Sequence, residues 1–455
     1  MNGVRDRVIR ADATIAVVGL GYVGLPLACH FSEAGFDVVG FDIDLNRVEQ
    51  LRDGTSYVED VDDDAVRRAL DQGFEPTTYA NALEEADAFL VAVPTGVEQS
   101  EPDMSAVRKA TESVATNAPD REVLFVCCST VYPGATDEII RTTLRENGRE
   151  PGEDVLVAFA PERINPGGSY DFEDIPIVVG ADTDEEREAA KTLFEAVVDD
   201  TVPVDSTGAA EMAKVLENTY RMVNIALVNE VARHAEAIGV DAWEAIEAAG
   251  TKPFGFQAFY PGPGVGGHCI PVDPQFLSWQ GRRNGQQLNL VEQAHAINES
   301  MPNHVVDRVE TALAGRGVSL ESASVSILGI TYKPNVGDIR NSPALSICEL
   351  LDSRGANIDV VDPYVDEVLV NETTFEPTDE IERDAIADAD AVLLLVDHDA
   401  FDYDVLNDAP IVFDGQDGLP DDLSTITMAL GDGTTVEQDH SPHTSPTTSS
   451  NTFQS

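Results

Sequence analysis

Apolar residues come in short runs separated by helix-like stretches through the first 205 residues of the chain. The runs are rich in β-branched residues and bounded by turn residues, as buried strands are. They read ATIAVVGL, DVVGFDI, AFLVAVP, VLFVCCST, VLVAFAPE and IPIVVGA. Strands that alternate with helices predict a parallel sheet covered by helices on both faces.

The same alternation returns after about residue 311, with the runs ASVSILGI, NIDVVDP, AVLLLVD and PIVFDG. Between the two halves lies TGAAEMAKVLENTYRMVNIALVNEVARHAEAIGV, which lacks Pro and carries apolar residues at helical spacing over much of its circumference. A helix of this kind is buried, and we expect a second subunit to cover it, in a homodimer or a higher homo-oligomer. The pattern predicts an α/β fold of two doubly wound parallel-sheet domains joined by a long central helix.

These patterns divide the chain into four parts. We expect a first α/β domain at residues 1–205, a central helical and dimerisation segment at 206–310, and a second α/β domain at 311–432. Residues 433–455 are polar and rich in Ser and Thr, which predicts a disordered tail. The tail contains His440 and His443, but we expect no metal site there.

Charge limits the partners that this chain can have. There are 83 Asp and Glu against 28 Lys and Arg in the 455 residues, for a formal net charge of -55. Nucleic acid and anionic membranes repel such a polyanion, so we expect neither as a partner. No apolar run approaches the roughly 18 residues of a membrane span. The first residues lack a signal-peptide pattern, and five cysteines do not indicate a disulfide framework, so a cytoplasmic location is expected.

Acidic residues are spread along the whole chain, which predicts a solvated acidic surface suited to high salt. An ordinary acidic surface is the alternative. Lysine is scarce, so each lysine is a stronger candidate for a functional role than usual. The five are Lys109, Lys191, Lys214, Lys252 and Lys333.

A glycine fingerprint follows the first predicted strand. Gly19, Gly21 and Gly24 stand in VVGLGYVGLPLA, between that strand and a helix-like run. They permit a tight turn, close approach of a pyrophosphate, and close packing of helix on strand, and the helix N-terminus attracts the anion. Asp42 ends the next strand, where an acid binds a ribose 2′-hydroxyl and repels a 2′-phosphate. The pattern predicts a Rossmann-like domain that binds NAD rather than NADP.

One cysteine lies in a different setting from the others. Cys269 lies in FYPGPGVGGHCIPVDP, a rigid Gly- and Pro-rich loop where flanking amides or a cation can activate a thiol. His268 is a candidate base, although adjacent side chains often point in opposite directions. No second Cys lies at metal-ligand spacing, so no metal is expected. The remaining cysteines are expected to be small buried residues: Cys29, Cys127, Cys128 and Cys348.

A dinucleotide fold together with a loop cysteine indicates one chemistry. An alcohol loses hydride to give an aldehyde, which the thiolate traps as a thiohemiacetal. A second hydride loss gives a thioester, and water hydrolyses the thioester to a carboxylate. One site then performs a four-electron oxidation.

Seven motifs, in order, carry a resemblance to a known family. The chain resembles the nucleotide-sugar 6-dehydrogenases, the UDP-glucose/UDP-N-acetylhexosamine dehydrogenase family, over about residues 12–430. The motifs are VVGLGYVGLPLA, VAVPTG, STVYPGAT, APERINPG, EMAKVLENTYRMVNIALVNE, YPGPGVGGHCIPVDP and ILGITYKPNVGDIRNSP. The resemblance implies an NAD domain, a central dimerising helix and a UDP-binding domain.

The resemblance also implies catalytic roles. Cys269 matches the nucleophile, and Lys214 and Asn218 match a pair on the central helix, where i,i+4 spacing puts both on one face. Lys214 then stabilises the developing oxyanion; a plain helix salt bridge to Glu211 or Glu217 is the alternative.

Three further residues match positions around the reacting atoms. Asp273 matches an acid that transfers protons through a water. Glu162 matches the acid that activates the hydrolytic water, against the alternative of an exposed loop carboxylate. Thr130 matches a residue near the cofactor and the catalytic water.

Ligand contacts follow from the same motifs. The implied cofactor contacts are Gly19, Gly21, Tyr22, Val23, Gly24, Asp42, Arg47, Pro94, Thr95, Thr130 and, from the second α/β domain, Arg340. The implied substrate contacts are Glu162, Arg163, Ile164, Lys214, Asn218, Tyr260, Gly264 and Lys333, the last for the nucleotide part.

Two motifs indicate the substrate branch. GVGGHCIP and PER resemble the enzymes of UDP-N-acetylhexosamines, whereas UDP-glucose enzymes usually carry GFGGSCF-like residues and PEF. UDP-N-acetylglucosamine and UDP-N-acetylmannosamine both remain open. Members acting on the latter often carry an upstream Arg where this chain has Lys252, Pro253 and Phe254.

Three other functions remain as alternatives: UDP-glucose oxidation, a single-step dehydrogenase with a structural Cys269, and a regulator that binds without catalysis.

Overall fold

The computed structural model describes residues 3–58, 60–163, 172–420, 423, 425 and 427–433. Contacts within the chain define two compact units. Unit 1 comprises residues 1–224 and 266–296, and unit 2 comprises 225–265 and 297–455. Each unit is described by itself. The four-part division expected from the sequence stays a prediction, and its tail lies outside the described residues except for Gly433, as do His440 and His443.

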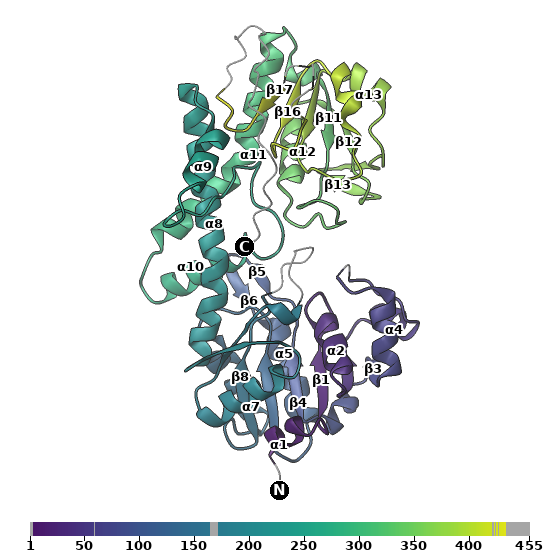
Figure 1. Cartoon of the computed structure of the whole chain (residues 1–455), viewed down its shortest axis with the longest axis vertical. Coiled ribbons are helices and arrows are strands. Elements are labelled where there is room, and N and C mark those ends of the chain that lie inside the picture. The colour runs from purple at the N-terminus through teal and green to yellow at the C-terminus, as the bar shows by residue number, and fades with distance from the viewer. Residues whose placement is uncertain are drawn as a thin grey trace. The chain divides into compact units, whose positions relative to one another are not determined.

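Unit 1 is built on a sheet that has eight strands among the described residues, in the order β10-β9-β8-β7-β4-β1-β2-β3 (Figure 1). The strands are β1 (Thr14–Val18), β2 (Asp37–Phe41), β3 (Phe74–Thr77), β4 (Ala88–Val91), β7 (Val123–Cys127), β8 (Val155–Phe159), β9 (Ile177–Gly180) and β10 (Thr201–Val204). All six predicted strands are present. The pattern missed β3 and β10, whose sequences FEPT and TVPV each contain a Pro. A small hairpin adds β5 (Gly96–Glu98) and β6 (Glu101–Asp103).

Six neighbouring strands of this sheet pair in parallel: β8, β7, β4, β1, β2 and β3. This pairing confirms the predicted parallel sheet. One local exception is that β9 pairs antiparallel to β8 through Phe159 and Gly180, and β10 runs parallel to β9.

The sheet of unit 1 has a core on each face. Ile15 and Val17 of β1 belong to one buried cluster, and Ala16 and Val18 belong to another, because successive side chains of a strand point to opposite faces. Helix α2 packs on the first face and α5 on the second. The helices of this unit are α1 (Val4–Ile9), α2 (Gly24–Glu33), α3 (Leu45–Arg52), α4 (Asp63–Asp71), α5 (Ser105–Asn117), α6 (Thr142–Glu146), α7 (Asp184–Phe194) and α10 (Asp273–Arg283).

The predicted central helix is present as α8 (Thr207–Ile238), and its residues belong to both units. A second long helix, α11 (Asn289–Gly315), also has residues in both. Short 3-10 turns span Ala80–Glu85, Phe172–Asp174, Leu320–Ser322 and Tyr403–Asp408, and a π-helical turn spans Thr136–Arg141.

Unit 2 contains the second predicted α/β domain. Among its described residues a five-stranded parallel sheet has the order β12-β11-β15-β16-β17. Its strands are β11 (Ser324–Leu328), β12 (Asn357–Val361), β15 (Ala391–Leu394), β16 (Val412–Asp414) and β17 (Thr427–Ala429), with a hairpin of β13 (Val368–Val370) and β14 (Thr373–Phe375). Its own helices are α9 (Ala242–Gly250), α12 (Pro343–Ser353) and α13 (Arg383–Asp388).

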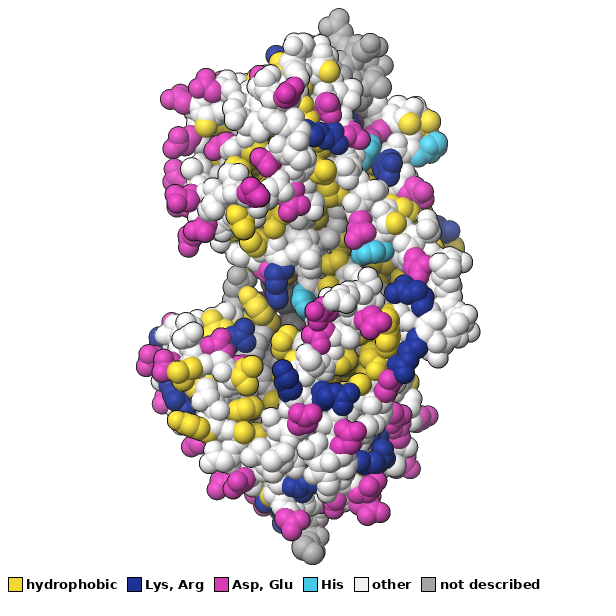
Figure 2. Space-filling model, turned by 180° about the vertical axis from the view of Figure 1, so that it is seen from behind, with side chains coloured by type: hydrophobic (Ala, Val, Ile, Leu, Met, Phe, Trp, Pro, Cys, Tyr) yellow, Lys and Arg dark blue, Asp and Glu magenta, His cyan; other side chains and the backbone are white. Residues whose placement is uncertain are grey.

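Surface charge follows the composition. Figure 2 shows Asp and Glu side chains spread over the face drawn rather than gathered in one patch. No helix among the described residues is long and apolar enough to span a membrane.

Candidate active site

The glycine loop has the geometry that a bound dinucleotide requires. Gly19 follows β1 with φ +93°, a left-handed value that favours glycine. A Cβ on Gly24 would lie 1.7 Å from the Gly19 carbonyl oxygen, so only glycine fits this close contact between loop and helix. A Cβ on Gly21 would meet no atom within 4 Å, which leaves its side of the loop open. The loop and the N-terminus of α2 therefore fit a pyrophosphate.

Asp42, directly after β2, holds this loop. Its carboxylate accepts hydrogen bonds from the Leu20 N–H at 2.8 Å and the Asp44 N–H at 2.9 Å. Arg47 lies beside it, with Nη1 3.6 Å from Asp42 Oδ2. Asp42 thus fixes the conformation of the loop as well as standing at the predicted ribose position.

Tyr57, between α3 and α4, contacts the same loop, although the sequence pattern gave no reason to select it. Its hydroxyl donates to the Leu20 carbonyl oxygen at 2.6 Å, and the Arg47 guanidinium lies 5.6 Å from its ring centre. Tyr22, half-exposed, and Val23, partly buried, complete the loop.

Two loops at the carboxyl ends of neighbouring strands are tied together. Thr95 Oγ1, in the loop after β4, donates to the Thr130 carbonyl oxygen at 2.7 Å. Ser129 Oγ accepts from the Val93 N–H at 2.9 Å. These contacts place Pro94, Thr95 and Thr130 at the same sheet edge as the glycine loop, since β7, β4 and β1 are adjacent and parallel.

Four of the predicted catalytic side chains lie together in one cluster in unit 1, where Lys214 and Asp273 are buried and Glu162 and Asn218 are half-buried. Lys214 Nζ, from α8, donates to the main-chain oxygen of Glu162 at 2.6 Å and lies 4.0 Å from Glu162 Oε2. Asn218 Nδ2, one turn further along α8, donates to Asp273 Oδ2 at 2.6 Å. Asp273 is the first residue of α10, and Glu162 follows β8. Segments distant in sequence thus meet at one point.

Burial changes the proton affinity of both acids in the cluster. It raises the pKa of Glu162 to about 7; Lys214 opposes this shift and Asp273 adds to it. It also raises the pKa of Asp273 to about 6, opposed by Lys214 and by the hydrogen bond from Asn218. Two acids that titrate near neutral pH are suited to proton transfer.

The alternative of a helix salt bridge for Lys214 receives no support from its neighbours on α8. Glu211 accepts hydrogen bonds from the backbone of Gly134 and Thr136. Glu217 forms a two-pronged ion pair with Arg163, with distances of 2.6 and 3.3 Å. Both carboxylates are engaged elsewhere, and the ion pair of Lys214 is with Glu162.

Cys269 is exposed, whereas the other four cysteines are buried as expected. Its main-chain oxygen accepts from the Asp273 N–H at 2.9 Å, which places the thiol-bearing residue one turn before the acid of the cluster. Burial raises the pKa of Cys29 to about 12, and that of Cys127 and Cys348 likewise, and it also raises the pKa of Cys128. Cys269 is therefore the accessible thiol of the chain.

Arg163, expected at the substrate, makes contacts within the protein. Besides the pair with Glu217, its Nη1 donates to the Pro176 carbonyl oxygen at 2.7 Å. The residue fixes the loop after β8 to α8. Ile164, the next predicted substrate contact, lies outside the described residues.

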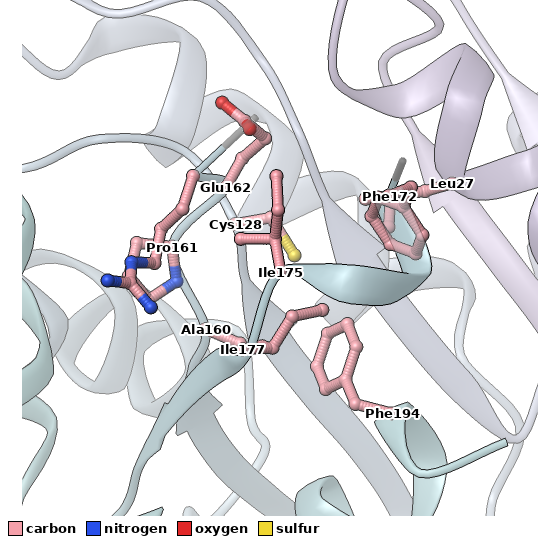
Figure 3. Close-up of a pocket in the computed structure, with 10 residues that line it drawn as sticks. Leu27, Cys128, Ala160, Pro161, Glu162, Phe172, Ile175, Ile177 and Phe194 are labelled. Carbon is pink, nitrogen blue, oxygen red and sulfur yellow. The ribbon is translucent and has the colours of Figure 1, made fainter. Parts of the chain in front are cut away.

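A small pocket adjoins Glu162 (Figure 3). Its lining is largely apolar, and Ile175 and Ile177 lie near the sulfur of Cys128. The Glu162 carboxylate points away from the apolar side chains of Ile175 and Ile177 (Figure 3).

The remaining predicted contacts belong to unit 2. Lys333 lies in the loop after β11, with Nζ 5.6 Å from the ring centre of Tyr332. Arg340, expected at the cofactor, pairs with Asp338 at 2.5 Å. Tyr260 stacks on Trp243 with ring centres 5.1 Å apart. Gly264 has φ +146°, and a Cβ there would lie 3.0 Å from Pro343.

His398 supports the loop that carries Lys333, and no sequence motif indicated it. It is 1% exposed. Its Nδ1 accepts from the Asn335 N–H at 2.9 Å, and its Nε2 lies 3.3 Å from Asp362 Oδ2. Asp362 in turn accepts from the Ile330 N–H at 2.7 Å. The imidazole therefore links β11, β12 and the Lys333 loop.

Comparisons with known proteins identify the family of this chain. Models of three domains from the UDP-glucose/GDP-mannose dehydrogenase family match the chain: the NAD-binding domain at residues 13–198, the central domain at 208–300 and the UDP-binding domain at 326–420.

Individual relatives cover nearly the whole chain. Protein CapL of Staphylococcus aureus is 37% identical over 431 residues, which are 92% of this chain and 99% of that protein. UDP-N-acetyl-D-glucosamine 6-dehydrogenase of Pseudomonas aeruginosa is 36% identical, over 86% of this chain and 92% of that protein. The solved UDP-D-ManNAc dehydrogenase of Pyrococcus horikoshii has a TM-score of 0.84 and 32% identity, covering 92% of this chain and 99% of that one. The chain therefore belongs to the UDP-glucose/GDP-mannose dehydrogenase family, and it is an NAD-dependent dehydrogenase.

Proposed function

We propose that this enzyme oxidises a UDP-N-acetylhexosamine at C6 to the corresponding uronic acid, in two steps at one site. The cluster of Lys214, Asn218, Asp273 and Glu162 next to the Cys269 loop carries this proposal. A single oxidation or simple binding needs no such combination of an accessible thiol, a buried cation and two acids of raised pKa.

Cofactor binding, covalent attachment of the substrate and stabilisation of the oxyanion are assigned to different residues. Bound NAD, held by the glycine loop and the Asp42 region, supplies the hydride acceptor for each oxidation. The Cys269 thiolate adds to the C6 aldehyde, and the resulting thiohemiacetal is oxidised to a thioester. Lys214 stabilises the oxyanion that forms in each addition, because its ammonium is a fixed charge in a buried site.

Proton transfers fall to the two acids. Asp273, oriented by Asn218, exchanges protons with the C6 oxygen through a water. Glu162 accepts a proton from the water that attacks the thioester, and the products are the carboxylate and the regenerated thiol. A pKa of about 7 leaves much of Glu162 ionised at neutral pH, as a general base requires.

The substrate class rests on two observations. The chain carries PER and GVGGHCIP around Glu162 and Cys269. Similar proteins are named for UDP-N-acetyl-D-glucosamine and for UDP-N-acetylmannosamine. We propose one of these two sugars, with Lys333 at the nucleotide part, and a cytoplasmic site of action.

We also propose that the enzyme is a homodimer. Helix α8 exposes apolar side chains at intervals of four and seven residues along its length: Met212, Leu216, Tyr220, Leu227, Val231 and Ile238. Leu216 and Leu227 are each 55% exposed, and a second copy of the helix would cover them. Sedimentation in concentrated KCl should give a dimer, and Leu216→Glu together with Leu227→Glu should give a monomer; a monomeric parent would contradict this part.

The ratio of NADH formed to sugar consumed tests the reaction. Purified enzyme is mixed with NAD and each of UDP-N-acetylglucosamine, UDP-N-acetylmannosamine and UDP-glucose in concentrated KCl. The proposal predicts two NADH per N-acetylated sugar and little turnover of UDP-glucose. One NADH per sugar would identify a single-step dehydrogenase, and preference for UDP-glucose would overturn the substrate class.

A further inference from the structure

Glu211 lies one turn before Lys214 on α8 and faces the same side of the helix. Its side chain is completely buried. One carboxylate oxygen accepts from the Gly134 N–H at 2.5 Å, and the other accepts from the Thr136 N–H at 2.8 Å. The carboxylate therefore binds the end of the segment 129–136, which carries Thr130.

The same segment is tied to a second helix of the cluster. Gln280 of α10 donates a hydrogen bond to the Pro133 carbonyl oxygen, and Trp279 packs on Tyr132 with ring centres 4.9 Å apart. Segment 129–136 thus contacts α8, which carries Lys214 and Asn218, and also α10, which begins at Asp273.

A contribution to folding stability does not explain why a carboxylate occupies position 211. Within the described part of the chain Glu211 has no ion pair with Lys or Arg. Burial raises its pKa, so the anion is disfavoured there even with two backbone donors. A buried charge without a cation usually costs folding free energy.

We propose that Glu211 is a positioning residue that holds the Thr130 segment in register with Lys214. This inference rests on the proposed function. In the proposed reaction Thr130 lies beside the cofactor and Lys214 beside the substrate, so the Glu211 carboxylate sets the position of the cofactor side relative to the substrate side. Hydride transfer depends steeply on that relation, because misplacement by about 1 Å costs on the order of 100-fold in rate.

Glu211→Gln tests the proposal with little change in shape. The amide oxygen accepts one of the two N–H groups, but the amide NH2 then faces the other donor. We expect kcat to fall by about ten- to 100-fold, with the KM for the UDP-sugar within about twofold, since the substrate contacts proposed in unit 2 are unaltered. Amide exchange of segment 129–136 should become faster.

Glu186→Gln is the matched control. Glu186 is also a completely buried carboxylate that accepts a backbone N–H, from Val157 at 3.1 Å, but it lies on α7 and pairs with Arg141. Its replacement should lower the midpoint of thermal unfolding while kcat stays within about twofold, because no catalytic contact changes. Gln280→Ala provides a second variant that loosens the same segment from the α10 side.

The results for these variants distinguish a positioning role of Glu211 from a purely structural one. A selective loss of kcat and faster exchange at 129–136 in Glu211→Gln, against an unaltered kcat in Glu186→Gln, supports the proposal. Unaltered exchange at 129–136, or a kcat that falls equally in both, overturns it. If Glu211→Gln does not fold, Gln280→Ala decides by the same two readouts. Amide exchange needs no turnover, so the result stands apart from the NADH ratio that tests the proposed function.

Discussion

The ammonium of Lys214 lies 2.6 Å from the main-chain oxygen of Glu162 and 4.0 Å from its carboxylate. The same ammonium thus contacts both the main chain and the side chain of Glu162. The carbonyl contact holds the lysine in place, and the longer contact opposes the rise in the pKa of Glu162. The positive charge of the site is therefore oriented before substrate binds, which is the condition for electrostatic stabilisation of an oxyanion.

Removing that charge should slow chemistry more than binding. Lys214→Met keeps an apolar stem of similar length but lacks the ammonium, and we expect kcat to fall by about 100- to 1000-fold. Steady-state kinetics measure the effect. Lys191→Met is the control, because Lys191 lies on α7 and pairs with the exposed Glu195. A fall of less than tenfold in Lys214→Met would remove the oxyanion role.

Glu162 should make the rate of thioester hydrolysis, which forms the uronic acid, depend on pH. Its pKa is raised from 4.5 to about 7, so the basic form increases as pH rises through 7. The rate of thioester hydrolysis should rise across this range, and Glu162→Gln should be slow at every pH. Single-turnover quench measurements between pH 5.5 and 8.5 test this; a pH-dependent limb that persists in Glu162→Gln would belong to another group.

The same shift has a consequence for stability. The folded chain holds a proton on Glu162 that the unfolded chain loses above pH 4.5, so this group destabilises the fold as pH rises through 7. Glu162→Gln should therefore gain stability relative to the parent between pH 5 and pH 8, as measured by urea unfolding.

His398 should control nucleotide binding without touching the reaction. His398→Ala removes the acceptor for the Asn335 N–H and leaves the Asp362 carboxylate without its imidazole partner. We expect the KM for the UDP-sugar to rise about tenfold, as typical for loss of a supporting hydrogen bond to a charged group, with the KM for NAD unaltered. Equal changes in both would indicate general unfolding. His234→Ala, at an exposed position of α8, is the control.

Salt should stabilise the enzyme. With a formal net charge of -55, repulsion among carboxylates disfavours the compact state, and salt screens it. The midpoint of thermal unfolding should rise steadily from 0.1 to 3 M KCl. A midpoint independent of KCl would leave the acidic surface without a role in high salt.

Periodicity predicted the strands and the central helix because buried apolar runs and helical spacing are local properties. It missed β3, since FEPT offers only one large apolar residue. Motifs predicted Lys214, Asn218, Asp273 and Glu162, and the structure brings them together. They could not indicate Glu211, Tyr57 or His398, whose partners lie far along the chain and are set by tertiary packing. Arg163 pairs with Glu217 and Arg340 pairs with Asp338, and the expected ligand contacts of both arginines stay predictions.

We propose that Cys269 carries the substrate between its two oxidations. Glu162→Gln enzyme is mixed with NAD and the preferred UDP-sugar, quenched in acid within one turnover, and digested for mass spectrometry. We expect the peptide containing Cys269 to gain the mass of the UDP-uronyl group, and Cys269→Ser to show no such thioester. An unmodified Cys269 peptide, with uronic acid still formed by Cys269→Ser, would contradict it.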